Sequence, residues 1–144
     1  MTAINKISLL AIAILLLAGA TCQEDKMEAI KGKKWILESI RGKAVTPPDA
    51  ERAPYLIFRD SNRVHGFSGC NSFFATYRLT GDGISIQPQG MTMSACPPGY
   101  SHRPLRAALL LTDRLELEAG KLHFMKGAEA LATFSEAPDE EAKN

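Results

Sequence analysis

The sequence predicts a mainly β fold: a single domain built on a small antiparallel sheet, curled or forming an open barrel, with one helix. Two observations favour this class. Short apolar runs alternate with turn signals, as at Asp60-Ser61-Asn62 and Gly81-Asp82-Gly83, which is the pattern of a β meander. Only the segment after Pro104 places its apolar residues at helical spacing instead.

The expected strands lie where apolar or alternating runs stand between turns. In the run over 84–86, Ile84 and Ile86 flank a serine, as a half-buried strand requires. A Pro-rich loop over 45–48 separates the first run from the second. Along the chain we expect seven or eight strands, drawn from 35–40, 55–58, 64–67, 73–79, 84–86, 115–117, 122–124 and 130–134.

The segment after residue 102 predicts the helix. Pro104 suits the first helical turn, where its missing N–H costs no hydrogen bond. Four residues then follow at the spacing i, i+3, i+4 and i+7, namely Leu105, Ala108, Leu109 and Thr112. We expect a helix near 103–113 that closes one end or one face of the curled sheet.

The first 21 residues have the composition of a signal peptide. Lys6 precedes an apolar run over 7–20, which is shorter than the ~20 residues that a membrane-spanning helix needs. Cleavage before Cys22 would free that cysteine for lipidation, although two of the three residues before it depart from the usual lipoprotein pattern. Cleavage after the A-x-A site at 18–20 would release a soluble protein instead.

The number of cysteines favours the lipidated form. Disulfides persist outside the cytoplasm, and three cysteines leave one unpaired. If Cys70 and Cys96 pair, Cys22 is left over and acylation would use it. Because Gln23 rather than Asp follows, we expect an outer-membrane lipoprotein in the cell envelope that faces the periplasm. A soluble periplasmic protein is the alternative.

Composition divides the mature chain into three parts. Residues 22–34 are mostly polar and predict a tether, and 35–134 hold the apolar runs of the domain. Residues 135–144 carry four acidic residues against one Lys and no large apolar side chain. Such a segment cannot offset the entropy of ordering, which predicts a mobile acidic tail.

The charge balance argues against a nucleic-acid partner. The whole chain has a formal net charge of +1, and Lys6 is the only charged residue before Cys22, so the mature chain carries 16 basic and 16 acidic residues. A balanced chain supplies no positive field to hold a phosphate backbone.

Two short segments are expected to form a stapled corner. A Cys70–Cys96 disulfide would close a loop of about 25 residues and contribute ~3–4 kcal/mol in the chain-entropy model. Gly69 is typical of a bulge or a close approach of strands, and Asn71 can satisfy backbone groups in an irregular turn. The two segments read Ser68-Gly69-Cys70-Asn71 and Met91-Thr92-Met93-Ser94-Ala95-Cys96.

These segments, with others, resemble the META domain. The resemblance extends over 35–134 and includes the HslJ-type heat-inducible envelope lipoproteins of bacteria. It implies a small β-barrel-like fold with a helix, similar to the pilot lipoproteins of type III secretion. The residues that carry it are Trp35, Leu37, Gly66 to Asn71, Phe74, Tyr77, Thr92, Met93, Ala95, Cys96 and the closing run 122–134.

The resemblance implies structural roles for Gly69, Asn71, Thr92 and Met93, and no established enzymatic activity. The family is associated with envelope stress tolerance, drug resistance, and secretion or motility. Its members usually carry a Glu at the start of the helix that follows the second cysteine. This chain instead reads Ser101-His102-Arg103-Pro104 there, so a role for that carboxylate is not expected.

Catalytic and metal sites are not favoured by the residue pattern. His65 could serve Cys70 as a base, but a disulfide-bonded sulfur offers no thiolate for attack. A metal site from His65, His102, His123 and the two domain cysteines lacks ligand spacing. We expect Met91 and Met93 to pack on one side near the disulfide rather than bind copper. No cofactor is expected.

The aromatic residues are expected mainly in the core. A domain of this size needs large rings inside, since aromatic side chains dominate core energetics. Phe73 and Phe74 are adjacent on an expected strand and must point to opposite faces, so one of them faces outward or lies under the helix. Phe73, Phe74 and Tyr77 are therefore the candidate binding surface.

Together these observations predict a non-catalytic envelope lipoprotein that binds another envelope protein as a stress or assembly accessory. The alternative is a soluble periplasmic carrier of a small apolar ligand, for which the aromatic set would line a pocket.

Overall fold

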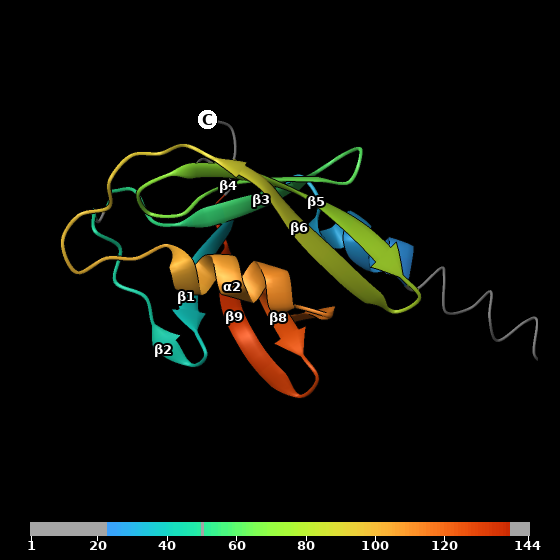
Figure 1. Cartoon of the computed structure of the whole chain (residues 1–144). Helices are drawn as coiled ribbons and strands as arrows, with labels where there is room; N and C mark the ends of the chain where they lie inside the picture. The colour runs from blue at the N-terminus through green and yellow to red at the C-terminus, as the bar shows by residue number, and fades with distance from the viewer. Residues whose placement is uncertain (1–22, 50, 139–144) are drawn as a thin grey trace, which may run out of the picture.

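The computed structural model describes residues 23–49 and 51–138, in which the chain forms nine strands and two helices (Figure 1). A first helix runs over residues 23–30, and α2 spans Arg103–Leu111. The strands are β1 (Trp35–Ile40), β2 (Lys43–Ala44), β3 (Tyr55–Arg59), β4 (Arg63–Phe67), β5 (Ser72–Thr80), β6 (Gly83–Met91), β7 (Arg114–Glu118), β8 (Lys121–Lys126) and β9 (Glu129–Glu136).

All nine strands form one antiparallel sheet in the order β6-β5-β4-β3-β1-β9-β8-β7, with β2 paired to β1. The sheet curls until the first residues of β6 reach the start of β7, where the Ile84 N–H donates to the Asp113 carbonyl at 2.9 Å. It is not closed into a barrel. The predicted class, a curled antiparallel sheet with a helix in one domain, is confirmed.

Helix α2 lies across the open side of the curl and packs against β6, β1, β8 and β9 (Figure 1). Leu105, Ala108 and Leu109 are its buried residues, and they are three of the four positions whose spacing predicts the helix. It ends at Leu111 because Thr112 is extended and its hydroxyl donates to the Met125 carbonyl at 3.0 Å.

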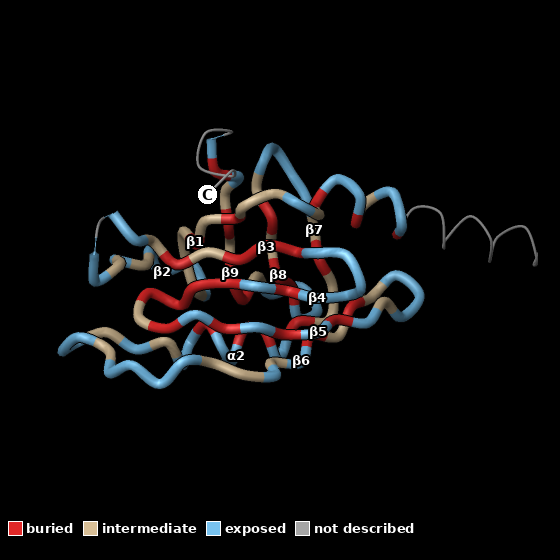
Figure 2. Tube along the Cα trace, turned by 90° about the horizontal axis from the view of Figure 1, so that it is seen from above, coloured by how far each residue is buried: buried red, intermediate tan, exposed pale blue. Residues whose placement is uncertain are grey.

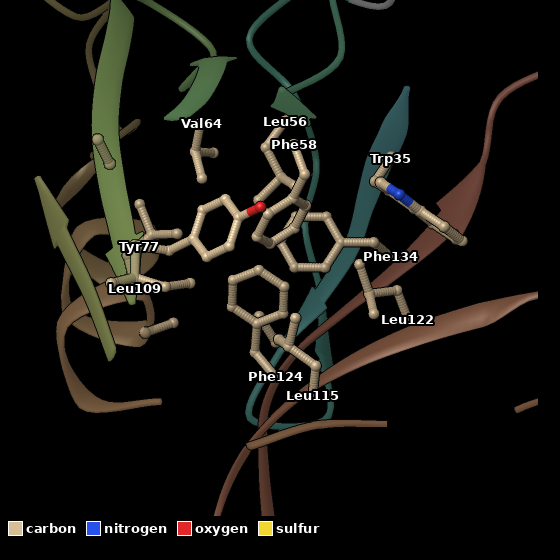
Figure 3. Packing of buried hydrophobic residues seen from close by; sticks show 14 of the residues in the cluster. Trp35, Leu56, Phe58, Val64, Tyr77, Leu109, Leu115, Leu122, Phe124 and Phe134 are labelled. Atoms are coloured by element: carbon tan, nitrogen blue, oxygen red, sulfur yellow. The ribbon is translucent and has the colours of Figure 1, made fainter. Parts of the chain in front are cut away.

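The core fills the inside of the curl (Figure 3). Phe58 from β3 stacks edge-on against Tyr77 from β5, with ring centroids 5.4 Å apart. Phe124 and Phe134, from β8 and β9, lie 4.8 Å apart. Such aromatic pairs add ~0.5–1.5 kcal/mol beyond the burial of apolar area. Tyr77 is thus a core residue and does not belong to a binding surface.

The hairpin of β5 and β6 is longer than the expected strands over 73–79 and 84–86. Strand β6 continues through Pro88 to Met91, and the register shifts opposite Phe74 and Ala75. Pro88 is tolerated because β6 is an edge strand, so its missing N–H breaks no bond to a further strand. The short β2 is not predicted by the sequence pattern.

The expected tether over 22–34 is wrong for its described residues. Residues 23–30 form a helix in which Met27 and Ile30 are 2% and 0% exposed. The Trp35 indole donates to the Ile30 carbonyl at 3.0 Å, which joins the helix to β1. Figure 2 shows buried and exposed positions in alternation along this helix, as its one-sided packing requires. The helix over 23–30 therefore belongs to the domain.

The expected tail over 135–144 also begins too early. Strand β9 continues to Glu136, and the Ala137 N–H donates to the Lys34 carbonyl at 2.8 Å. Residues 139–144 lie outside the described residues, as do the expected signal peptide at 1–21 and the lipidation site at Cys22. Among the residues that are described, no helix is long and apolar enough to cross a membrane.

Candidate functional site

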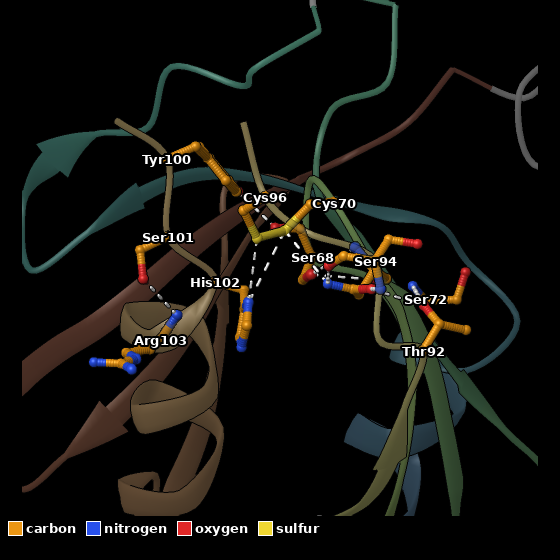
Figure 4. Close-up of a disulfide and its surroundings, with 11 residues drawn as sticks. Ser68, Cys70, Ser72, Thr92, Ser94, Cys96, Tyr100, Ser101, His102 and Arg103 are labelled. Atoms are coloured by element: carbon orange, nitrogen blue, oxygen red, sulfur yellow. Dashed lines mark hydrogen bonds between the residues drawn. A yellow bond between two sulfur atoms is a disulfide. The ribbon is translucent and has the colours of Figure 1, made fainter. Parts of the chain in front are cut away.

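The candidate site lies where the loop from β4 to β5 meets the loop from β6 to α2 (Figure 4). Cys70 and Cys96 are joined by a disulfide with their Cα atoms 5.2 Å apart. The predicted staple is confirmed. It fastens the long loop after β6 onto the turn before β5, two segments 26 residues apart in the sequence.

The turn over 68–71 is held by its own two ends. The Ser68 N–H donates to the Asn71 carbonyl at 2.8 Å, and the Ser68 hydroxyl donates to the same oxygen at 3.0 Å. In return, the Asn71 N–H donates to the Ser68 hydroxyl at 3.2 Å. Both residues are buried, and a buried polar group costs free energy unless it is bonded in this way.

The Asn71 side chain connects this turn to the loop after β6. Its Nδ2 donates to the Ser94 carbonyl at 2.9 Å, and its Oδ1 accepts from the Ser94 N–H at 2.7 Å. The same Oδ1 accepts from the Thr92 hydroxyl at 3.0 Å. Thr92 in turn accepts the Ser72 N–H at 3.1 Å. Asn71 and Thr92 therefore have architectural roles in the corner.

Gly69 is required by its conformation and by its neighbour Tyr100. Its φ is +99°, a region that side chains rarely adopt, and a Cβ there would overlap the Tyr100 ring. The Tyr100 hydroxyl donates to the Ser68 carbonyl at 2.6 Å. Burial raises the pKa of the Tyr100 phenol, because the charged form would lose its solvation.

A histidine lies against the disulfide, and it is His102 rather than His65. Its Nδ1 is 3.4 Å from the Cys96 Sγ and 3.9 Å from the Cys70 Sγ. The side chain points from the start of α2 toward the sulfur atoms (Figure 4). His65 instead pairs with Phe74 across two strands, and His123 contacts Thr133 on β9. The structure therefore does not bring the three histidines together.

The ligand atoms of Cys70, Cys96 and His102 lie within 4.8 Å of one another, a spacing compatible with a metal ion. The two sulfurs are bonded to each other, however, and metals bind the thiolate form of cysteine. The residues as they stand do not fit a metal site. They form a packed contact between the disulfide and the beginning of α2.

The neighbouring apolar residues divide between core and surface. Phe73 is 6% exposed and Phe74 is 53% exposed, so the expected opposite orientation of this pair is confirmed. Met91 packs against the core, whereas Met93 is 93% exposed. The expectation that both methionines pack near the disulfide is wrong for Met93, because β6 ends at Met91 and the chain then enters a loop.

A cavity of about 240 Å³ opens beside the corner, between α2 and the second half of β6. Phe73, Met91, Leu105 and Leu109 provide its apolar wall. Its polar residues include His102 and Arg106. The sequence pattern placed Phe73 at a candidate binding surface, and it identified Leu105 and Leu109 only as positions that form the helix.

The sequence pattern indicates no individual role at this corner for Ser68, Ser94, Tyr100 or Arg106. His102 appears in that pattern only as part of a metal set that lacks ligand spacing. Tyr100 and its partner Gly69 are 31 positions apart in the sequence, so their neighbours along the chain give no signal of this contact. No local pattern indicates that the loop over 92–102 folds back onto the turn at 68–71.

A sequence model of the META domain matches residues 28–139. A structure determined by NMR is similar at a TM-score of 0.56 and 20% identity, over 75% of this chain and 92% of that one. A second NMR structure, of a protein from Burkholderia xenovorans, is similar at a TM-score of 0.56 and 25% identity, over 76% of this chain and 85% of that one. No curated protein matches the chain. Since the family match extends over more than half of the sequence, the chain belongs to the META domain family.

Proposed function

We propose that this META domain protein is a non-catalytic lipoprotein of the cell envelope that binds another envelope protein as a stress or assembly accessory. One observation carries the proposal. The polar side chains of the stapled corner are bonded within the corner, while two large apolar side chains beside it, Phe74 and Met93, are 53% and 93% exposed. A rigid corner that presents exposed apolar side chains suits recognition better than chemistry.

The bonding of the reactive atoms supports a non-catalytic role. The Ser68 hydroxyl is buried and donates to a backbone carbonyl, and the Thr92 hydroxyl donates to Asn71. The cysteine nearest to a histidine is held in a disulfide. A nucleophile needs a free hydroxyl or thiolate beside a base, and these residues are committed to holding the corner together.

The envelope location rests on the sequence, through the apolar run over 7–20 and the leftover Cys22. The helix that begins by residue 23 packs onto the domain, with the Gln23 amide donating to the Gly83 carbonyl at 3.3 Å. A lipid on Cys22 would therefore hold the domain close to the bilayer without a spacer. The proposal also includes that the protein is an HslJ-type lipoprotein and that it is anchored in the outer membrane.

The partner can be sought with a photo-crosslinking amino acid placed at position 74 or 93 in cells of the native host. We expect discrete protein adducts from these two positions. The exposed position 43, on β2, serves as the control and should give none. The same adducts from position 43, or none from 74 and 93, would contradict a protein-binding role for this surface.

A second candidate function is a soluble periplasmic carrier of a small apolar ligand, and the cavity beside α2 favours it. Intact-mass analysis of the mature protein from its host distinguishes the lipid-anchored form from the soluble form. Acyl mass on a chain that begins at Cys22 supports the lipoprotein, whereas an unmodified chain that begins at Thr21 supports the soluble form.

A further inference from the structure

The cavity between α2 and β6 has the composition of a site for a small amphiphile. Its apolar wall comes from both elements, with Met91 from β6 and Leu105 and Leu109 from one face of α2. Its volume of about 240 Å³ is slightly below the ~300–1,000 Å³ that is usual for drug-sized ligands. A short alkyl chain fits such a space, and a large ring system does not.

The polar side of this cavity is cationic. The Arg106 guanidinium makes no hydrogen bond or ion pair with any residue that the structure describes. Among the residues that the structure describes, no acidic residue lines the cavity, and the sequence contains none between Asp82 and Asp113. No described acidic residue therefore neutralises the positive charge at the cavity, and none would repel a bound anion.

The beginning of α2 adds to this preference for an anion. The first turn contains no acidic residue, and the N-cap residue His102 makes no side-chain capping bond. A helix N-terminus carries about half a positive charge and is stabilised by a negative group nearby. Because the His102 Nδ1 faces the sulfurs, its Nε2 is the ring nitrogen left for a ligand in the cavity that His102 lines.

We propose that this cavity binds a small monoanionic amphiphile: a carboxylate with an unbranched chain of roughly eight carbons, sized to the cavity. The carboxylate accepts from Arg106, and the chain lies among Met91, Leu105 and Leu109. A carboxylate matches a guanidinium because both are planar and can form two parallel hydrogen bonds. The proposal does not depend on the protein partner proposed above, and it specifies the ligand of the second candidate function.

The test is calorimetric titration of the purified mature protein, disulfide intact, with octanoate, octanol, octylamine and octyl phosphate. We expect octanoate to bind at least ~10-fold more tightly than octanol or octylamine, since one charge-assisted hydrogen bond is worth about that factor. Octyl phosphate that binds ~10-fold more tightly than octanoate would overturn the choice of a monoanion. No octanoate binding, or equal binding of octanol, would overturn the proposal as a whole.

Two arginines on α2 give a matched pair of variants. Arg106→Gln removes the charge that lines the cavity, and Arg103→Gln removes an exposed charge one turn earlier that does not line it. Octanoate should bind ~10-fold more weakly to R106Q and less than ~2-fold more weakly to R103Q. R106K should fall between them, at ~3-fold weaker binding, because lysine keeps the positive charge but lacks the planar pair of donors. Equal losses in R106Q and R103Q would show a diffuse surface effect and contradict the site.

The alkyl side of the site is tested separately. Met91→Trp should fill the cavity from the β6 side and abolish octanoate binding, with circular dichroism used to confirm that the fold is kept. Amide NMR shifts on octanoate addition should be largest at Met91, Leu105 and Leu109. Shifts confined to the exposed Phe74 face would overturn the assignment. Because these measurements use the purified protein alone, their failure is distinct from a failure to crosslink a partner.

Discussion

The carboxamide of Asn71 holds the backbone of Ser94 from both sides, since its Nδ2 donates to the Ser94 carbonyl and its Oδ1 accepts the Ser94 N–H. Only Asn or Gln can both donate and accept in this way, and the side chain is 2% exposed. The loop after β6 thereby gains a strand-like contact with a residue 23 positions earlier.

Asn71→Asp should therefore destabilise the protein although the two side chains have nearly the same shape. A carboxylate cannot donate to the Ser94 carbonyl, and it would be buried beside that oxygen. We expect the free energy of unfolding to fall by ~2–4 kcal/mol in urea denaturation at neutral pH. The matched control is Gln87→Glu at an exposed position on β6, which should change the free energy of unfolding by less than ~0.5 kcal/mol. Equal effects would contradict the assigned role of Asn71.

Gly69→Ala should be costly for two separable reasons, its φ of +99° and its contact with Tyr100. We expect a loss of at least ~2 kcal/mol in thermal or urea unfolding. Gly120→Ala controls for conformation alone, because its φ is +75° and a Cβ there meets nothing within 4 Å. In a Tyr100→Ala background the cost of Gly69→Ala should fall toward that of Gly120→Ala. An unchanged cost would show that the ring is not the obstacle.

Loss of the disulfide should lower the free energy of unfolding by an amount set by the length of the loop that it closes. The bond joins residues 26 positions apart, which corresponds to about 3–4 kcal/mol of denatured-state entropy. We expect the Cys70→Ser, Cys96→Ser double variant to show this loss in urea and to match the reduced, alkylated wild type. Thiol labelling of the untreated exported protein should tag neither sulfur, and labelling of both would contradict the bond.

The helix over 23–30 should behave as part of the domain. Ile30→Ala removes a fully buried side chain and should cost ~2–4 kcal/mol. Glu28→Ala, on the exposed side of the same helix, should change the free energy of unfolding by less than ~0.5 kcal/mol. A negligible effect of Ile30→Ala would restore the interpretation of this segment as a tether.

Alkaline pH should destabilise the corner through Tyr100. Burial raises the pKa of its phenol, so the folded state holds this proton more tightly than the unfolded chain does. The contribution to stability is complete below the unfolded value of ~10 and is lost as pH rises through the folded pKa. Stability measured against pH should thus decline less steeply in Tyr100→Phe than in the wild type. Parallel alkaline declines would contradict this assignment.

Most of the sheet could be predicted because its information is local. Along β5, Phe73, Ala75 and Tyr77 are buried while the residues between them are exposed, and this alternation is visible in the sequence itself. Pro104 and the spacing of Leu105, Ala108 and Leu109 locate α2 in the same way. The helix over 23–30 also has helical spacing, since its buried residues Gln23, Met27 and Ile30 lie at i, i+4 and i+7. In the sequence alone the many charged residues of this segment hide that spacing. Only the folded sheet provides the surface against which the three side chains are buried.

By itself, the sequence determined the strand pattern, the position of α2, the cysteine pair and the opposite orientation of Phe73 and Phe74. These features depend on the periodicity of apolar residues, on turn residues and on the odd number of cysteines. All three are properties of neighbouring residues or simple counts. Only the tertiary structure decided that Tyr100 lies on Gly69, that His102 meets the disulfide and that Arg106 borders a cavity. Each of these contacts joins segments that meet because the sheet curls and the loop after β6 folds back, and no local pattern encodes that meeting.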